Sequence, residues 1–154
     1  MFDVVVFGSA TEDIFLELPH QKNDADFLDK KECFCLPFGS KILIDDMEVF
    51  SGGGGTNVAC SLANLGFNCG YYGKVGKDSP GQLILNDLKK FKVKTNFCLK
   101  DKNLQTAVSF IASSSKDRAI LIYKGACHFL LKEEINFEKI KKTKWFYLAP
   151  FYEK

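Results

Sequence analysis

Two groups of polar and glycine residues in this 154-residue chain could bind a hydroxyl-rich ligand. Four consecutive glycines, Gly52 to Gly55, lead through Thr56 to Asn57 and a helical pattern, while Asp13 follows the first apolar run. Glycine backbone at a helix N-terminus lets a ligand approach the amide groups, and asparagine offers both a donor and an acceptor. A carboxylate such as Asp13 can accept hydrogen bonds from two adjacent hydroxyls. This combination suits a polyhydroxylated ligand.

Each of these residues also has a purely structural interpretation. Asp13 could be a turn or capping acid, and Asn57 could cap the helix that follows it. The glycines could form a flexible linker, but the helical pattern directly after them favours an ordered turn. The choice therefore depends on whether Asp13 and Asn57 lie on the same rim of the fold.

The common phosphate-binding motifs are missing. A P-loop requires Gly, four residues and then Gly-Lys-Ser/Thr, and neither Gly73-Lys74 nor Gly76-Lys77 has the partner residues at those positions. The first strand leads into Gly8-Ser9-Ala10-Thr11, which is not a G-x-G-x-x-G fingerprint, so a nicotinamide-binding domain is not indicated. The six cysteines are irregularly spaced, and Cys33 and Cys35 have no second close pair, so we predict reduced thiols and no metal site.

The apolar patterns predict an α/β fold in a single domain. We expect strands buried in a parallel sheet at 2–7, 69–75 and 145–149, and half-exposed antiparallel strands at 14–18 and 41–50, separated by a polar loop at 19–29. We expect a hairpin from 105–113 and 117–123, and helices at 57–65, from Asp78 or Ser79 to about 91, and at 133–142. Right-handed crossovers then give a three-layer sandwich.

Charge and hydropathy point to no nucleic acid and no membrane. The net charge is only +2, and the longest apolar runs are far shorter than a bilayer span. The N-terminus carries Asp3 and no basic region, which is unlike a signal peptide, so we expect a cytoplasmic protein.

Three motifs, taken together, resemble the N-terminal signature of the ribokinase (PfkB) family of sugar and nucleoside kinases. They occur in the family's order and spacing: Gly8-Ser9-x-x-x-Asp13, then Gly52 to Ala59 opening a helix that ends in Leu65-Gly66, then Gly73-Lys74-Val75-Gly76-Lys77-Asp78-x-x-Gly81. The element Tyr123 to Ala126 is similar to the family's segment after its hairpin. The resemblance covers the whole chain and implies a ribokinase-like α/β/α sandwich (Rossmann-like), truncated, with a small β-strand lid at about 14–18 and 32–50.

The resemblance also implies roles for individual residues. Asp13, the backbone at Gly53 and Gly54, and Asn57 would hold substrate hydroxyls, and Thr106 is a further substrate-binding candidate. Many relatives pair with a second subunit through the lid, so a homodimer is implied. Full-length members use ATP and Mg²⁺.

Family members are about twice as long as this chain, and their Gly-Ala-Gly-Asp segment supplies the catalytic base and the anion hole. That segment does not occur here, and Asp78 is expected to be a helix cap and not the base. We therefore predict that residues 1–154 are the N-terminal part of the kinase domain, with the nucleotide-binding and catalytic part absent. They would be the substrate-binding half of a kinase that transfers the γ-phosphate of ATP to a sugar hydroxyl when the C-terminal half is present. The alternative is a noncatalytic module that binds a sugar or nucleoside, or dimerises.

Overall fold

The structure is a computed structural model that describes residues 1–18, 36, 38–114 and 117–149. The predicted loop at 19–29 and the first residues of the predicted lid, 32–35, lie outside the described residues. Two four-stranded sheets organise the rest of the chain, and they are called the body sheet and the lid sheet below.

The body sheet is fully parallel and has the strand order β5-β4-β1-β8. Its strands are β1 (Val4–Phe7), β4 (Cys69–Gly76), β5 (Lys94–Asp101) and β8 (Trp145–Leu148). The central strands β1 and β4 are buried along their whole length, because helices cover one face and short helical turns cover the other. This confirms the prediction of buried parallel strands for the apolar runs at 2–7 and 69–75.

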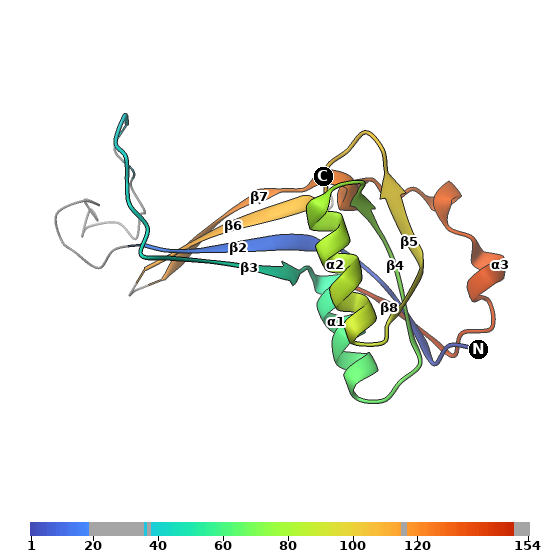
Figure 1. The fold of residues 1–154 in the computed structure, drawn as a ribbon. Helices are drawn as coiled ribbons and strands as arrows, with labels where there is room; N and C mark the ends of the chain where they lie inside the picture. Colours follow the sequence, from blue (N-terminus) through green and yellow to red (C-terminus); the bar gives the residue numbers. More distant parts are fainter. Residues whose placement is uncertain (19–35, 37, 115–116, 150–154) are drawn as a thin grey trace.

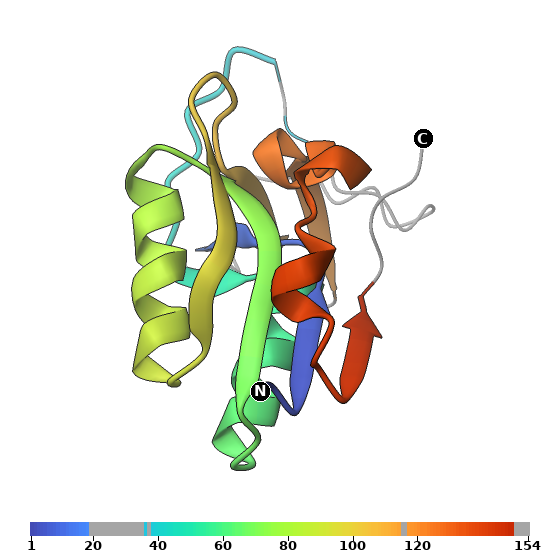
Figure 2. The ribbon, with the colours of Figure 1, turned by 90° about the vertical axis from the view of Figure 1, so that its right-hand side faces the viewer.

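Helices α1 (Gly54–Asn64) and α2 (Ser79–Lys90) pack on one face of the body sheet, as Figures 1 and 2 show. The opposite face carries η1 (Gly125–Phe129), η2 (Lys132–Glu134) and α3 (Phe137–Ile140). Alternating side chains of β1 supply both cores: Val4 and Val6 pack toward Ile84 of α2, and Val5 and Phe7 pack toward Ile140 of α3. The three-layer arrangement is therefore confirmed.

The lid sheet projects away from this body (Figure 1) and has the order β3-β2-β6-β7. Its strands are β2 (Thr11–Glu17), β3 (Asp46–Gly52), β6 (Ala107–Ser113) and β7 (Arg118–Tyr123). The predicted hairpin of β6 and β7 is present and joins β2 by a parallel pairing. The lid is thus larger than the two strands predicted, while residues 41–45, which were expected in a strand, are not part of one.

Three further predictions need correction. Strand β5 was not predicted, because lysines, an asparagine and an aspartate interrupt its apolar residues. The helix expected at 133–142 is reduced to η2 and the four-residue α3, since Asn136 starts a new helix by accepting the Lys139 N–H. Strand β8 was expected to be buried, but it lies at the edge of the sheet with its aromatic side chains exposed.

Among the described residues, four cysteines are present as free thiols: Cys60, Cys69, Cys98 and Cys127. Burial raises the pKa of Cys69 to about 11 and that of Cys98 to about 12, so both thiols stay protonated near neutral pH. No helix in the described part of the chain is long and apolar enough to cross a membrane.

Candidate functional site

Asp13 lies in β2 with its carboxylate against the backbone of β3. Thr11 donates a hydrogen bond from its hydroxyl to Asp13 Oδ1 at 2.9 Å. Thr11 pairs with Gly52 across the two strands, and a Cβ at Gly52 would lie only 1.9 Å from Asp13 Oδ2. Gly52 is therefore required for the carboxylate to occupy this position.

The glycines after Gly52 let the start of α1 pack against the turn between β1 and β2. Gly53 has a φ of 104°, and a Cβ there would lie 2.5 Å from the carbonyl oxygen of Ser9. Ser9 Oγ accepts the Gly54 N–H at 3.0 Å, and the carbonyl oxygen of Ser9 accepts the N–H groups of Gly55 and Thr56. Three amides at the helix start thus already have protein partners, which the sequence-based expectation of open amides did not include.

Asp13 and Asn57 line one open hollow at the junction of the lid sheet and α1. The hollow has a volume of about 330 Å³, and its wall consists of Asp13, Phe15, Glu48, Phe50, Ser51, Gly52 and Asn57. Asn57 lies one helical turn into α1, where its backbone N–H donates to the Gly53 carbonyl oxygen at 3.0 Å. Asn57 is therefore not the N-cap, a position taken by Gly53 without a side-chain hydrogen bond.

Two phenyl rings form the apolar wall of this hollow. Phe15 and Phe50 contact each other edge to face, with ring centroids 5.9 Å apart. A ring of this kind can cover the C–H face of a sugar while the polar groups opposite take its hydroxyls. The hollow thus combines a carboxylate and an amide with an aromatic surface.

Thr106 lies away from the hollow. Its side chain is completely buried, its hydroxyl donates to Asp78 Oδ1 at 2.5 Å and accepts the Gly76 N–H at 2.8 Å, and its own N–H donates to Asp78 Oδ2. Thr106 is not among the residues that line the hollow. These contacts give it a structural role in joining the start of α2 to the end of β4.

Asp78 is the N-cap of α2, as the sequence predicted, and accepts the Gly81 N–H at 2.9 Å. Burial alone would raise the pKa of Asp78, but the hydrogen bonds from the hydroxyl and N–H of Thr106 and from Gly81 lower it below its ordinary value. Asp78 therefore favours its charged form here. A depressed pKa contributes stability above the unfolded pKa of the group, and this contribution is lost as the pH falls through the folded pKa.

Replacing Thr106 with valine is expected to lower the free energy of unfolding by about 2–3 kcal/mol at pH 7, because the buried Gly76 N–H and the Asp78 carboxylate each lose a partner. The pKa of Asp78 should rise toward its unfolded value. The loss of stability between pH 6 and pH 3 should then be smaller in the variant than in the wild type. Urea unfolding across this pH range measures both effects. Equal acid sensitivity of the two proteins would contradict the role of Thr106.

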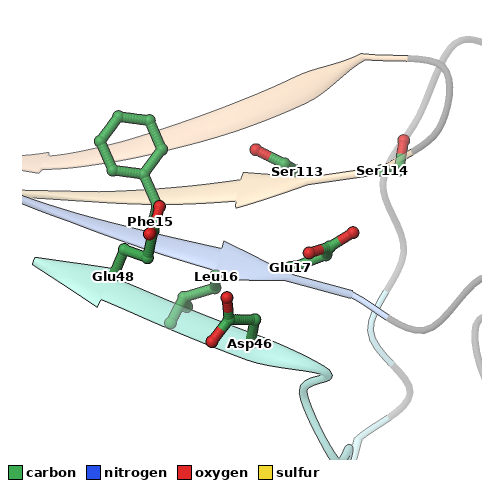
Figure 3. Close-up of a pocket in the computed structure, with 7 residues that line it drawn as sticks. All are labelled: Phe15, Leu16, Glu17, Asp46, Glu48, Ser113 and Ser114. Atoms are coloured by element: carbon green, nitrogen blue, oxygen red, sulfur yellow. The ribbon is translucent and has the colours of Figure 1, made fainter.

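A second hollow of about 190 Å³ lies farther out on the lid sheet (Figure 3). Its wall is formed by Phe15, Leu16, Glu17, Asp46, Glu48, Ser113 and Ser114. It shares Phe15 and Glu48 with the first hollow, so the two hollows are neighbours on the lid sheet. Across the described residues, no group of three or more His, Cys, Asp or Glu side chains is arranged to hold a metal ion.

Sequence reasoning had not singled out Ser9, Phe15, Glu48 and Phe50. Alternation along β2 offered a signal for Phe15, since residues two apart in a strand share a face and Asp13 was already a candidate. The partners from β3 depend on the strand register, which pairs Asp13 with Phe50 and Phe15 with Glu48. A register between strands that lie far apart in the sequence is not readable from a single sequence.

Comparison with known proteins identifies similar sequences and folds. A family model described as pfkB family carbohydrate kinase matches residues 1–153. Fructokinase-2 of Oryza sativa subsp. japonica is 33% identical over 99 residues, which are 62% of this chain and 30% of that protein. The ribokinase of Bacillus subtilis strain 168 is 33% identical over 88 residues, covering 57% of this chain and 30% of that protein. The matched segments thus span less than a third of these curated relatives.

Solved structures share the fold at lower sequence identity. A ribokinase of Arabidopsis thaliana complexed with ribose and ATP has a TM-score of 0.76 and 22% identity, and the match covers 96% of this chain and 45% of that one. A ribokinase of Cryptococcus neoformans var. grubii serotype A in complex with ADP has a TM-score of 0.72 and 21% identity, covering 96% and 42%. This chain therefore spans less than half of these proteins.

Proposed function

Because the chain belongs to the pfkB family of carbohydrate kinases, we propose that residues 1–154 form the sugar-binding part of an ATP-dependent carbohydrate or nucleoside kinase. The complete kinase would transfer the γ-phosphate of ATP to a sugar hydroxyl. The observation that carries the proposal is the joint position of Asp13 and Asn57 on a hollow with an aromatic wall. The ribokinase neighbour complexed with ribose and ATP supports the same substrate class.

In this proposal Asp13 accepts hydrogen bonds from two neighbouring sugar hydroxyls, and Asn57 binds a third. Thr11 and Gly52 fix the Asp13 carboxylate before the sugar arrives, so little ordering is needed on binding. The backbone at Gly53 and Gly54 shapes the adjoining helix start, although the Gly54 N–H is already used by Ser9. Substrate binding by Thr106 stays a prediction, and its hydroxyl already bonds Asp78 and Gly76.

The N-termini of α1 and α2 are not open to bind the phosphates of a nucleoside triphosphate. Helix N-termini are the usual anion sites, but the first amides of α1 donate to Ser9 and an early amide of α2 donates to Asp78. We therefore place the binding of ATP and Mg²⁺, the catalytic base and the anion hole in residues outside these 154. When bound, ATP supplies the phosphoryl group.

The lid sheet has a second task in this scheme. Phosphoryl transfer must exclude water, because otherwise ATP is hydrolysed in place of the sugar reaction. The lid sheet carries Asp13 and both phenyl rings of the hollow, so a movement of this sheet toward the body would bury the sugar and orient it at the same time.

We also propose a cytoplasmic location, supported by the free thiols of the described cysteines.

Because sugar binding is assigned to residues 1–154 and catalysis to residues outside them, we expect no sugar-dependent ATP turnover by residues 1–154 alone. The measurement is ADP release with ATP, Mg²⁺ and either D-fructose or D-ribose. The same assay on a chain extended through a Gly-Ala-Gly-Asp segment encoded downstream should give turnover. Sugar-dependent ADP release by the 154-residue chain would contradict the absence of a base.

The second candidate function is a noncatalytic module that dimerises. One surface of the lid sheet supports a dimer whether the chain belongs to a kinase or to such a module. The lid face opposite the hollow is apolar over all four strands and includes Ile14, Met47, Val49, Phe110 and Leu121. Met47 is 57% exposed and Leu121 is 65% exposed. We propose that a second copy of the chain covers this face, since continuous apolar surface of this kind is typical of protein interfaces.

The double variant Val49→Glu, Leu121→Glu is expected to be monomeric in sedimentation-velocity experiments in which the wild type is a dimer. Two charges placed in an apolar interface would remain unpaired, and the penalty exceeds what a modest interface provides. Phe67→Glu, which alters an exposed phenylalanine in the body, is the matched control and should stay dimeric. A monomeric wild type, or a dimeric double variant, would rule out this face as the interface.

A further inference from the structure

The two neighbouring hollows of the lid sheet have several carboxylates in their walls. Directly opposed residues of antiparallel strands point to the same face, and residues two apart do so as well. The register therefore places six side chains of β2 and β3 on one face of the lid sheet: Asp13, Phe15, Glu17, Asp46, Glu48 and Phe50. With Asn57 they define what is called the lid groove below.

Glu48 occupies the middle of the lid groove. It is paired with Phe15 across the strands and lines both hollows, so it lies between Asp13 on one side and Glu17 and Asp46 on the other. Figure 3 shows Glu48 and Phe15 rising on the same side of neighbouring strands. Within the described part of the chain, no lysine or arginine lines either hollow.

Some of these carboxylates can be explained as surface charges that keep the sheet in solution, but Glu48 cannot be explained in this way alone. Glu17 and Asp46 end their strands, where charges commonly protect a sheet from edge-to-edge association. Glu48 is different, because it is mid-strand, beside the aromatic wall of the hollow that holds Asp13. A sugar bound between Asp13 and Phe50 would have Glu48 as its neighbour.

We propose that Glu48 is a specificity-determining residue that excludes sugars carrying a carboxylate or phosphate, so that the site takes uncharged sugars. This inference rests on the proposed function and names the substrate class of the same site. Asp13 is needed for the hydroxyls, and an anionic substrate would meet both its carboxylate and that of Glu48, while no lysine or arginine is among the described residues that line this hollow. For an uncharged sugar, the same carboxylates accept hydrogen bonds from its hydroxyl groups.

The test compares two ligands of similar size, D-fructose and D-gluconate, by ligand-observed NMR titration of the 154-residue chain. The wild type should bind gluconate at least about tenfold more weakly than fructose, as expected for a single nearby like charge at a protein surface. Glu48→Gln should reduce this ratio by about threefold or more, and Glu48→Lys should bring it close to one or reverse it. Glu138→Gln removes the same charge from α3, far from the groove, and should leave the ratio unchanged.

The outcomes separate the inference from the proposed function. If neither ligand binds, the sugar-binding function fails and the inference fails with it. If fructose and gluconate bind equally to the wild type, or if Glu48→Lys leaves their ratio unchanged, only the inference is overturned. Glu48 is exposed, so its substitution should not affect folding, and thermal unfolding of each variant checks this.

Discussion

Replacing Asp13 with alanine is expected to weaken sugar binding by at least about 100-fold while the chain stays folded. Two hydrogen bonds from sugar hydroxyls to a carboxylate contribute about 3–5 kcal/mol together, because each involves a charged acceptor. The Asp13 side chain is only half-buried and accepts a hydrogen bond from Thr11, so its loss should disturb the lid sheet little. Calorimetric titration with D-fructose and D-ribose measures the effect.

Asp46→Ala is the matched control for Asp13→Ala. It removes a carboxylate from β3 on the same face of the lid sheet, but outside the hollow that contains Asn57. Its sugar affinity should stay within about threefold of the wild type, since a distant exposed charge interacts weakly through water. Equal losses in the two variants would show that lid charge in general, and not the Asp13 position, supports binding.

Replacing Gly55 with valine is expected to lower the free energy of unfolding by at least about 3 kcal/mol, which would leave a chain of this size marginally folded. A Cβ at Gly55 would lie 2.6 Å from the Cα and carbonyl carbon of Gly8, which are backbone atoms directly after β1 and cannot move aside independently. The helix start would have to separate from the turn that positions Ser9. Urea unfolding followed by circular dichroism measures the loss.

The neighbouring glycine provides a sharp control for Gly55→Val. A Cβ at Gly54 would have Ala149 Cβ at 3.6 Å as its nearest contact, an ordinary van der Waals distance. Gly54→Ala should therefore change the free energy of unfolding by no more than about 1 kcal/mol, and helix propensity favours alanine. If Gly54→Ala were as destabilising as Gly55→Val, close packing at the helix start would not explain the glycine run.

The elements that the sequence predicted best are those with strong local signals. Asp78, Ser79 and Pro80 start α2, Gly66 has a φ of 93° just after α1, and β1 is an uninterrupted apolar run. Each of these features depends on residues close together in the chain, so one sequence suffices to read it.

The errors arose where distant segments decide the outcome. The sequence of β8 resembles that of a buried strand, yet β8 lies at a sheet edge, and the burial of a strand depends on what packs against it. The hydrogen bonds of Thr106 to Asp78 and Gly76 were likewise not readable from the sequence, and its role in ligand binding stays a prediction. The Gly54 N–H was expected to be open to a ligand, but in the structure it donates a hydrogen bond to Ser9 Oγ.

The sequence allowed the two polar residues of the candidate site, Asp13 and Asn57, to be predicted, but not the other residues that line the hollow. Asp13 and Asn57 could be placed on one rim, because Asp13 follows the first strand and Asn57 opens a helix at the same end of the sheet. Phe50 and Glu48 reach the site only through the pairing of β2 with β3. Their contribution to binding stays a prediction, as does that of Asp13 and Asn57.

The central claim is that the hollow between Asp13 and Asn57 binds a sugar. Titration of the ¹⁵N-labelled 154-residue chain with D-fructose or D-ribose, followed by amide chemical shifts, tests it most directly. The account predicts saturable shifts concentrated at the amides of 13–15 and 48–57, together with their disappearance in Asp13→Ala. Shifts confined to other parts of the chain, or none with either sugar, would contradict it.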